Sequence, residues 1–136
     1  MSAPALHRLR VYWEDTDGSG VVYHASYLRF FERARTEWLR DLGYSQERLL
    51  REFALAFIVA GLQIDYRAPA RLDDALVART TIAACRRASL IFAQTLHRDG
   101  EETVLARAEV RVGCVATPGF RPLPLPAELR TALLGP

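Results

Sequence analysis

The sequence predicts a single α+β domain in which a curved antiparallel sheet wraps around one long helix. Three observations support this prediction. A segment near the N-terminus has the period of an amphipathic helix, with aromatic residues along a broad face. From residue 54 onward the pattern becomes that of β-strands, in four long runs. The chain has 136 residues, 50% of them hydrophobic, which suits one domain with its own core.

The first predicted element is a short strand over residues 7–14, where apolar side chains alternate with polar ones. Residues 15–20 contain two Asp and two Gly, a composition typical of a turn. The helix follows, and its apolar positions recur at helical spacing: Tyr27, Phe30, Phe31, Ala34 and Trp38. We expect Ser26 to cap this helix and Gly43 to end it. A second, shorter helix is predicted over residues 45–53, with Ser45 as its cap.

Four β-rich runs make up the rest of the domain: residues 57–67, 75–85, 89–98 and 103–116. The breaks between them are short, so we expect consecutive strands to pair as antiparallel neighbours in a meander. Asp99-Gly100 is a strong hairpin signal. Residues 118–136 form a Pro-rich C-terminal tail, in which a short helix is expected over residues 127–134.

The composition excludes several classes of protein. The formal net charge is only +2, and all 18 basic residues are Arg, scattered among acids, so nucleic-acid binding is not expected. No apolar run is long enough for a signal peptide or a membrane span, and a cytoplasmic protein is expected. Cys85 and Cys114 lie in apolar, strand-like runs without metal-ligand spacing, so we expect buried core thiols.

Asp17, in the Gly-rich turn, is the first candidate catalytic residue. An aspartate of ordinary pKa is ionised at neutral pH and can act as a nucleophile or a general base. The alternative is structural, with Asp15 and Asp17 organising the turn through hydrogen bonds to its backbone. A calcium loop is rejected because no Glu stands at its twelfth position.

His24, just before the helix, is the second candidate. The unpaired N–H groups of a first helical turn suit an oxyanion or an acyl carbonyl, although a structural histidine is the alternative. Arg86 and Arg87 stand at a turn between strands and are followed by Ser89. This set could hold a phosphorylated carrier, or the arginines could simply be solvated. On the helix, Glu32 and Glu37 are interpreted as salt-bridge partners of nearby arginines.

A longer pattern covers residues 11–28 and 31–37, which include VYWEDTD, GVVYHASYL and FERARTE. It resembles the signature of YbgC-type acyl-CoA thioesterases, in the 4-hydroxybenzoyl-CoA thioesterase branch of the hotdog-fold superfamily. The likeness continues more weakly to about Ala116 and leaves out the last twenty residues. It implies a hotdog fold, dimers or tetramers with active sites between subunits, and hydrolysis of acyl-CoA without a metal or organic cofactor.

The resemblance places the family's catalytic aspartate at Asp17 and its histidine at His24, whose backbone N–H would polarise the thioester carbonyl. It assigns four further residues to substrate binding: Tyr23, Arg86, Arg87 and Ser89. One position departs from the family pattern, because Trp13 stands where a second Tyr is common. Trp offers only an N–H donor.

We therefore expect an acyl-CoA thioesterase in which Asp17 either attacks the carbonyl or activates a water. One rival is a binding module for acyl groups or acyl-carrier protein, associated with the Tol-Pal envelope system. Another is a dehydratase of the same fold. The acyl group, the carrier, the chemical route and the choice of dimer or tetramer stay open. Four residues are candidates to line the acyl pocket: Phe57, Leu62, Ile64 and Phe92.

Overall fold

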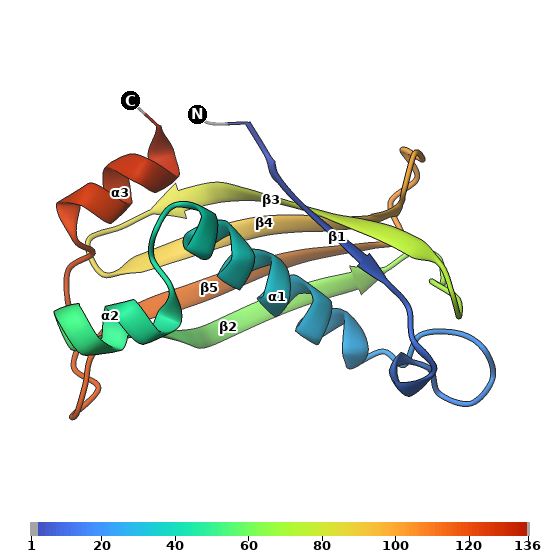
Figure 1. Ribbon diagram of the computed structural model, residues 1–136, viewed down its shortest axis with the longest axis horizontal. Helices are drawn as coiled ribbons and strands as arrows, with labels where there is room; N and C mark the ends of the chain where they lie inside the picture. The colour runs from blue at the N-terminus through green and yellow to red at the C-terminus, as the bar shows by residue number, and fades with distance from the viewer. Residues whose placement is uncertain (1–2, 136) are drawn as a thin grey trace.

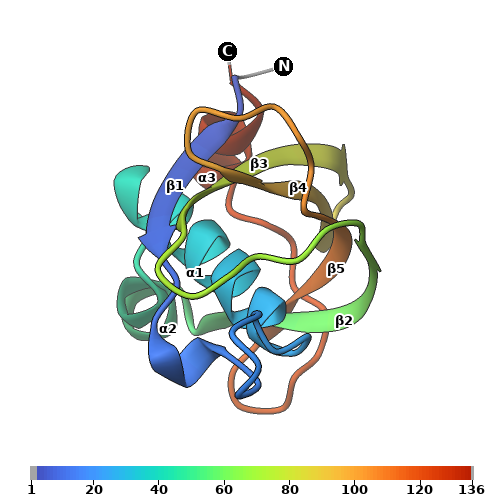
Figure 2. The same ribbon diagram turned by 90° about the vertical axis from the view of Figure 1, so that its right-hand side faces the viewer.

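The computed structural model describes residues 3–135 and confirms the α+β class. Within these residues five strands form one antiparallel sheet that curves around helix α1, as Figures 1 and 2 show. In chain order the elements are β1 (Ala5–Arg10), one turn of 3-10 helix (Trp13–Asp15), α1 (Ser26–Asp41), α2 (Gln46–Phe53), β2 (Leu55–Tyr66), β3 (Ala75–Cys85), β4 (Ser89–Arg98), β5 (Ala106–Ala116) and α3 (Ala127–Leu134).

Helix α1 lies on the concave face of the sheet. Its buried side chains include those that the helical spacing predicted: Tyr27, Phe30, Phe31, Ala34 and Trp38. The ring of Trp38 meets the ring of Phe92 on β4 edge-on, with centroids 6.2 Å apart. Burial of these rings stabilises the fold by roughly 25 cal/mol for each Å² of apolar surface removed from water.

The predicted meander is wrong in its strand order. The order is β1-β3-β4-β5-β2, so β2 pairs with β5 and not with β3. The connection between β2 and β3 is not a hairpin, because the N–H groups of Arg67 and Ala68 donate to the Leu105 carbonyl at 2.8 and 3.1 Å. The Val22 N–H also donates to the Ala70 carbonyl at 2.9 Å. The connection therefore crosses the end of the sheet, and β3 pairs with β1.

Local contacts correct two further predictions. The first strand ends at Arg10, because the Asp15 carboxylate accepts a hydrogen bond from the Tyr12 N–H at 2.8 Å and the chain turns there. Ser26 does not cap α1. The N-cap is Ala25, and the buried Ser26 hydroxyl instead accepts a hydrogen bond from the Arg29 guanidinium at 2.8 Å.

The β4–β5 connection is longer than the predicted hairpin turn. The two strands do pair, but β5 begins at Ala106 rather than at residue 103. The register ends at the pair Leu96 and Ala106, where the Leu105 N–H donates to the Leu96 carbonyl at 2.8 Å, and the residues before Leu105 form a wider loop that contains Asp99 and Gly100.

Other local predictions are confirmed. The Ser45 hydroxyl caps α2 by accepting from the Arg48 N–H at 3.1 Å, and Gly43 follows α1 with a φ of +92°. The C-terminal helix is present as α3, and its Leu129 and Leu133 are buried in the same core as α1.

Both cysteines are free. Cys114 is buried as predicted, and this burial raises the pKa of its thiol to about 11. Cys85 is only partly buried, and the Arg130 guanidinium lies 3.3 Å from its Sγ. Among residues 3–135, no helix has the length and apolar character needed to cross a membrane.

Candidate active site

Asp17 lies in a tight loop between the 3-10 turn and α1. The Asp17 N–H donates to the Val21 carbonyl at 3.1 Å, and Gly18 and Gly20 adopt φ angles of +91° and +94° to close the loop. The Asp17 carboxylate accepts hydrogen bonds from the hydroxyl of Ser19 and, at 2.9 Å, from its backbone N–H. These two bonds hold the pKa of Asp17 below its ordinary value, so the exposed carboxylate is ionised at neutral pH.

The two oxygens of this carboxylate differ in their contacts. Oδ1 accepts both hydrogen bonds from Ser19, which is the structural role of a turn-forming aspartate. Oδ2 has no hydrogen-bond partner among residues 3–135. Asp17 therefore organises the loop through one oxygen and keeps the other free for a ligand or a water.

His24 immediately precedes Ala25, the N-cap of α1. Within the described chain its backbone N–H has no acceptor, and it lies at the end of the helix where the dipole is positive. The imidazole is exposed and packs against the ring of Tyr23, with centroids 4.5 Å apart. An uncommitted N–H at a helix N-terminus is suited to bind a carbonyl oxygen that gains negative charge.

Two tyrosines that were not among the predicted site residues hold this end of α1 in place. The hydroxyl of Tyr66, at the end of β2, donates to the His24 carbonyl at 2.7 Å. The hydroxyl of Tyr27 accepts from the Ala70 N–H at 3.1 Å and ties the helix to the β2–β3 connection. The two side chains, with His24, line a pocket of about 300 Å³ whose other residues are Val22, Arg67, Ala68 and Pro69.

Arg86, Arg87 and Ser89 lie far from Asp17 and His24 within one protomer. They form the β3–β4 turn, where the Arg86 N–H donates to the Ser89 carbonyl at 2.8 Å. Figure 1 shows this turn at the opposite end of the sheet from the N-terminus of α1. The 11 residues of β3 separate the two ends by roughly 35 Å.

A third arginine, missed in the sequence, lies at the β3–β4 turn. Arg130 on α3 donates to the Arg86 carbonyl at 2.8 Å and so adds a positive charge beside the two turn arginines. Of the two helical glutamates, Glu37 forms the expected ion pair, with Arg40 at 3.0 Å. Glu32 makes no ion pair within 4.0 Å among residues 3–135.

The candidate lining residues divide into two groups. Phe57 and Phe92 line a small pocket beside the C-terminal half of α1. Leu62 is exposed on β2, and Ile64 packs against the core. Together with Ile58 and Val59, Leu62 makes the outer edge of β2 apolar and exposed, and this edge pairs with no strand in the described chain.

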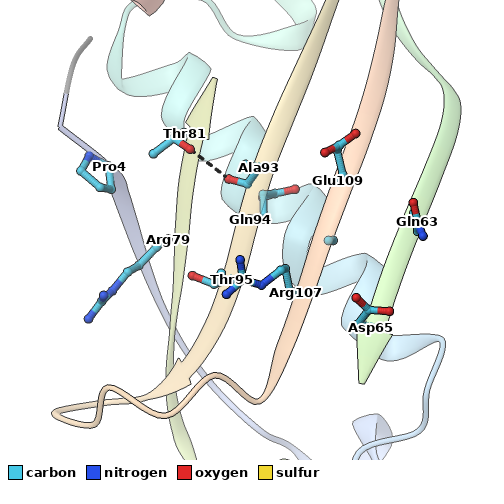
Figure 3. Close-up of a pocket in the computed structure, with 11 residues that line it drawn as sticks. Pro4, Gln63, Asp65, Arg79, Thr81, Ala93, Gln94, Thr95, Arg107 and Glu109 are labelled. Atoms are coloured by element: carbon cyan, nitrogen blue, oxygen red, sulfur yellow. Dashed lines mark hydrogen bonds between the residues drawn. The ribbon is translucent and has the colours of Figure 1, made fainter. Parts of the chain in front are cut away.

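A hollow of about 470 Å³ lies on the face of the sheet opposite α1. Figure 3 shows Asp65, Arg79, Arg107 and Glu109 around it. None of the predicted site residues lines it. Among residues 3–135, no three His, Cys, Asp or Glu side chains are grouped closely enough to hold a metal ion.

Comparison with known proteins gives consistent matches. The sequence profile of the thioesterase-like superfamily matches residues 11–133. An acyl-CoA thioesterase YbgC from Haemophilus influenzae is 48% identical over 124 residues, covering 91% of this chain and 90% of that protein. The solved structure of a probable thioesterase from Bartonella henselae is 37% identical, with a TM-score of 0.85, and covers 91% of this chain and 100% of that one. That of Slr0204, a 1,4-dihydroxy-2-naphthoyl-CoA thioesterase from Synechocystis, is 28% identical, with a TM-score of 0.89 and 96% coverage of both chains.

These likenesses confirm the hotdog fold and correct one expectation about its extent. The match reaches residue 133, so α3 lies within the likeness and not outside it. The physical reason is that Leu129 and Leu133 complete the core that α1 and the sheet begin.

Proposed function

This chain belongs to the thioesterase-like superfamily and is a thioester hydrolase, and we propose that it hydrolyses acyl-CoA at the N-terminal end of α1. One observation carries the proposal. An ionised carboxylate with an uncommitted oxygen, that of Asp17, lies in the loop that leads to the unpaired backbone N–H of His24. A nucleophile or base and an oxyanion donor are the two groups that thioester hydrolysis requires.

The thioester carbonyl would accept a hydrogen bond from the His24 N–H, which polarises it. In one route Asp17 attacks the carbonyl carbon and releases the CoA thiolate, which takes a proton. Water then hydrolyses the mixed anhydride and regenerates the carboxylate. In the other route Asp17 takes a proton from a water whose oxygen attacks the same carbon. The tetrahedral intermediate then breaks its C–S bond, and the departing CoA thiolate takes the proton held by Asp17. The exposed imidazole of His24 orients the water or assists the departing thiolate through a hydrogen bond, and Tyr23 contacts the substrate beside it.

The functional unit that we propose is a homodimer formed through the free edge of β2, or a homotetramer built from two such dimers. Long apolar strand edges readily pair with another chain. Antiparallel pairing about the middle of β2 would bring the Tyr66 end of one subunit beside the Leu55 end of the partner subunit. It would also bring Arg86, Arg87 and Ser89 of the partner subunit toward Asp17, where they can bind the phosphates of CoA. Because both cysteines are free, as is usual in the cytoplasm, we place the enzyme there.

The test is release of CoA thiol from a panel of short, long and aromatic acyl-CoAs, with the Asp17→Asn variant beside the wild type. We expect Asp17→Asn to lower kcat by about 10²- to 10⁴-fold, the usual contribution of a positioned base or nucleophile, while acyl-CoA still binds. Glu14→Gln is the matched control, since it removes a neighbouring exposed carboxylate and should leave turnover unchanged.

Near-normal turnover by a folded Asp17→Asn protein would refute the role of Asp17. If the wild type binds acyl-CoA but cleaves none of the panel, the acyl-binding or carrier-protein-binding module replaces the enzyme.

A further inference from the structure

A small pocket of about 90 Å³ opens beside the C-terminal half of α1, away from His24. Its walls are mainly apolar: Leu39, Phe57, Val59, Phe92 and Val112. The charged side chain of Arg35 lies among them, with Glu32, Thr36 and Gln46 at the rim. This is space for about three water molecules, so a compact group fits it and a long alkyl chain does not.

The position of Arg35 is fixed by a buried amide. Its guanidinium donates through Nη1 to the Gln94 Oε1 at 2.9 Å. Gln94 is buried, and its Nε2 donates to the Phe31 carbonyl at 3.0 Å and to the Thr80 hydroxyl at 2.9 Å. Because the Phe31 carbonyl can only accept, the amide nitrogen must face it, and the amide oxygen then faces Arg35.

Arg35 is only partly buried, but within the described chain it lacks a close counter-ion. No carboxylate lies within 4.0 Å of it among residues 3–135, and its remaining N–H groups have no acceptor there. Glu32 attracts it from one helical turn away, and the Phe92 ring centroid lies 6.0 Å from its Cζ. Burial lowers the pKa of Arg35, yet a guanidinium remains charged in proteins. A partly desolvated cation without a close counter-ion gains free energy when a ligand supplies the anion.

We propose that Arg35, held by Gln94, determines specificity by binding a carboxylate at the end of the acyl group remote from the thioester. The preferred substrates are then compact ω-carboxyacyl-CoAs, the half thioesters of dicarboxylic acids. A guanidinium can bind a carboxylate through two parallel hydrogen bonds, which gives both strength and direction. The apolar walls would enclose the methylene groups between the carboxylate and the thioester.

This inference rests on the proposed function and its β2-paired dimer. Within one protomer, Arg35 stands 11 positions after His24, or about 16 Å at the rise of a helix. In the dimer, the Tyr66 end of β2, next to His24, would lie close to Phe57 of the partner subunit, which lines the partner's pocket. The pocket that serves each Asp17 would therefore belong to the other subunit.

The experiment compares kcat/KM for matched pairs of substrates with equal carbon number: glutaryl- with pentanoyl-CoA, adipoyl- with hexanoyl-CoA, and suberoyl- with octanoyl-CoA. We expect the wild type to prefer the ω-carboxy member of at least one pair by tenfold or more. Arg35→Met and Arg35→Gln should abolish that preference by slowing hydrolysis of the ω-carboxy member. Arg35→Lys, which keeps the charge but not the planar fork, should retain part of it.

Arg8→Met is the control, because it removes an exposed arginine from the opposite edge of the sheet and should keep the wild-type preference. A wild type that cleaves the alkanoyl-CoAs as fast as their ω-carboxy partners overturns this inference and leaves the thioesterase assignment standing. A preference that survives in folded Arg35→Met or Arg35→Gln overturns it as well. If no acyl-CoA is cleaved at all, the proposed function fails, and equal binding of glutaryl- and pentanoyl-CoA, measured by calorimetry, would also reject the role of Arg35.

Discussion

The hydrogen bond from Tyr66 to the His24 carbonyl is the contact that most directly connects the sheet to the proposed oxyanion donor. It is 2.7 Å long and joins residues 42 positions apart in the sequence. Burial raises the pKa of Tyr66, with a smaller effect from Tyr27, so the phenol remains a donor throughout a neutral assay. Tyr66→Phe removes the donor and keeps the ring that packs on Tyr27, with centroids 5.1 Å apart.

A neutral hydrogen bond contributes about 0.5–1.5 kcal/mol net. If its whole value holds the His24 peptide in its catalytic orientation, Tyr66→Phe should lower kcat/KM by about two- to twelvefold. If the bond also stabilises the folded state by that amount, Tm should fall by about 2–6 °C. Steady-state thiol release and thermal unfolding monitored by circular dichroism measure the two effects separately.

Tyr44→Phe is the matched control for loss of a tyrosine hydroxyl. Its hydroxyl donates to Glu128 at 3.3 Å, between the region after α1 and α3, far from His24. This variant should change Tm alone. A Tyr66→Phe enzyme with lowered Tm but wild-type kcat/KM would refute the reasoning, because the hydroxyl would then serve stability only.

Two further predictions concern titration. Ser19→Ala removes the larger of the two hydrogen bonds that lower the pKa of Asp17, so this pKa should rise toward its ordinary value. Since activity needs the ionised carboxylate, which is lost as pH falls through the pKa, the acid limb of the pH–kcat/KM profile should move to higher pH. An unmoved limb would assign it to another group. The second prediction concerns the cysteines. Cys114, with a thiol pKa of about 11, should react with a disulfide reagent only after denaturation, whereas the partly buried Cys85 should react in the native protein. Two reactive thiols in the native protein would contradict the burial of Cys114.

The sequence predicted what depends on local spacing. The aromatic face of α1 could be read from Tyr27 to Trp38, and the cap of α2 from Ser45, because both depend on residues within a few turns. The order of the strands could not. The alternation of apolar and polar residues shows which face of a strand is buried. It does not show which neighbours the strands β2 and β3 pair with. Short connections favoured consecutive pairing, and the backbone bonds of Ala68 and Ala70 decided otherwise.

The candidate site divides in the same way. Asp17 and His24 belong to one continuous segment and were predicted from it, whereas Tyr66 and Gln94 reach the helix from distant strands. A signal for Gln94 was present, since it takes an inward position in β4 between the buried Phe92 and Leu96. A polar amide at such a position needs partners inside the fold, and Arg35 is one of them.

The strand order also explains why the proposed site needs two subunits. In the observed order of the described strands, β2 pairs only with β5 and lies at one end of the sheet. At the edge, β2 exposes a strand of 12 residues that includes the apolar Ile58, Val59 and Leu62 and contains no proline, with one register shift between Val59 and Gly61. The two ends of β2 lie near different parts of the proposed site. Tyr66, at one end, contacts His24, and Phe57, near the other end, lines the pocket of Arg35. Antiparallel pairing with a second copy of the chain is the simplest operation that covers this edge. In such a dimer each Asp17 would lie near the Arg35 pocket of the other subunit, so that two equivalent sites form.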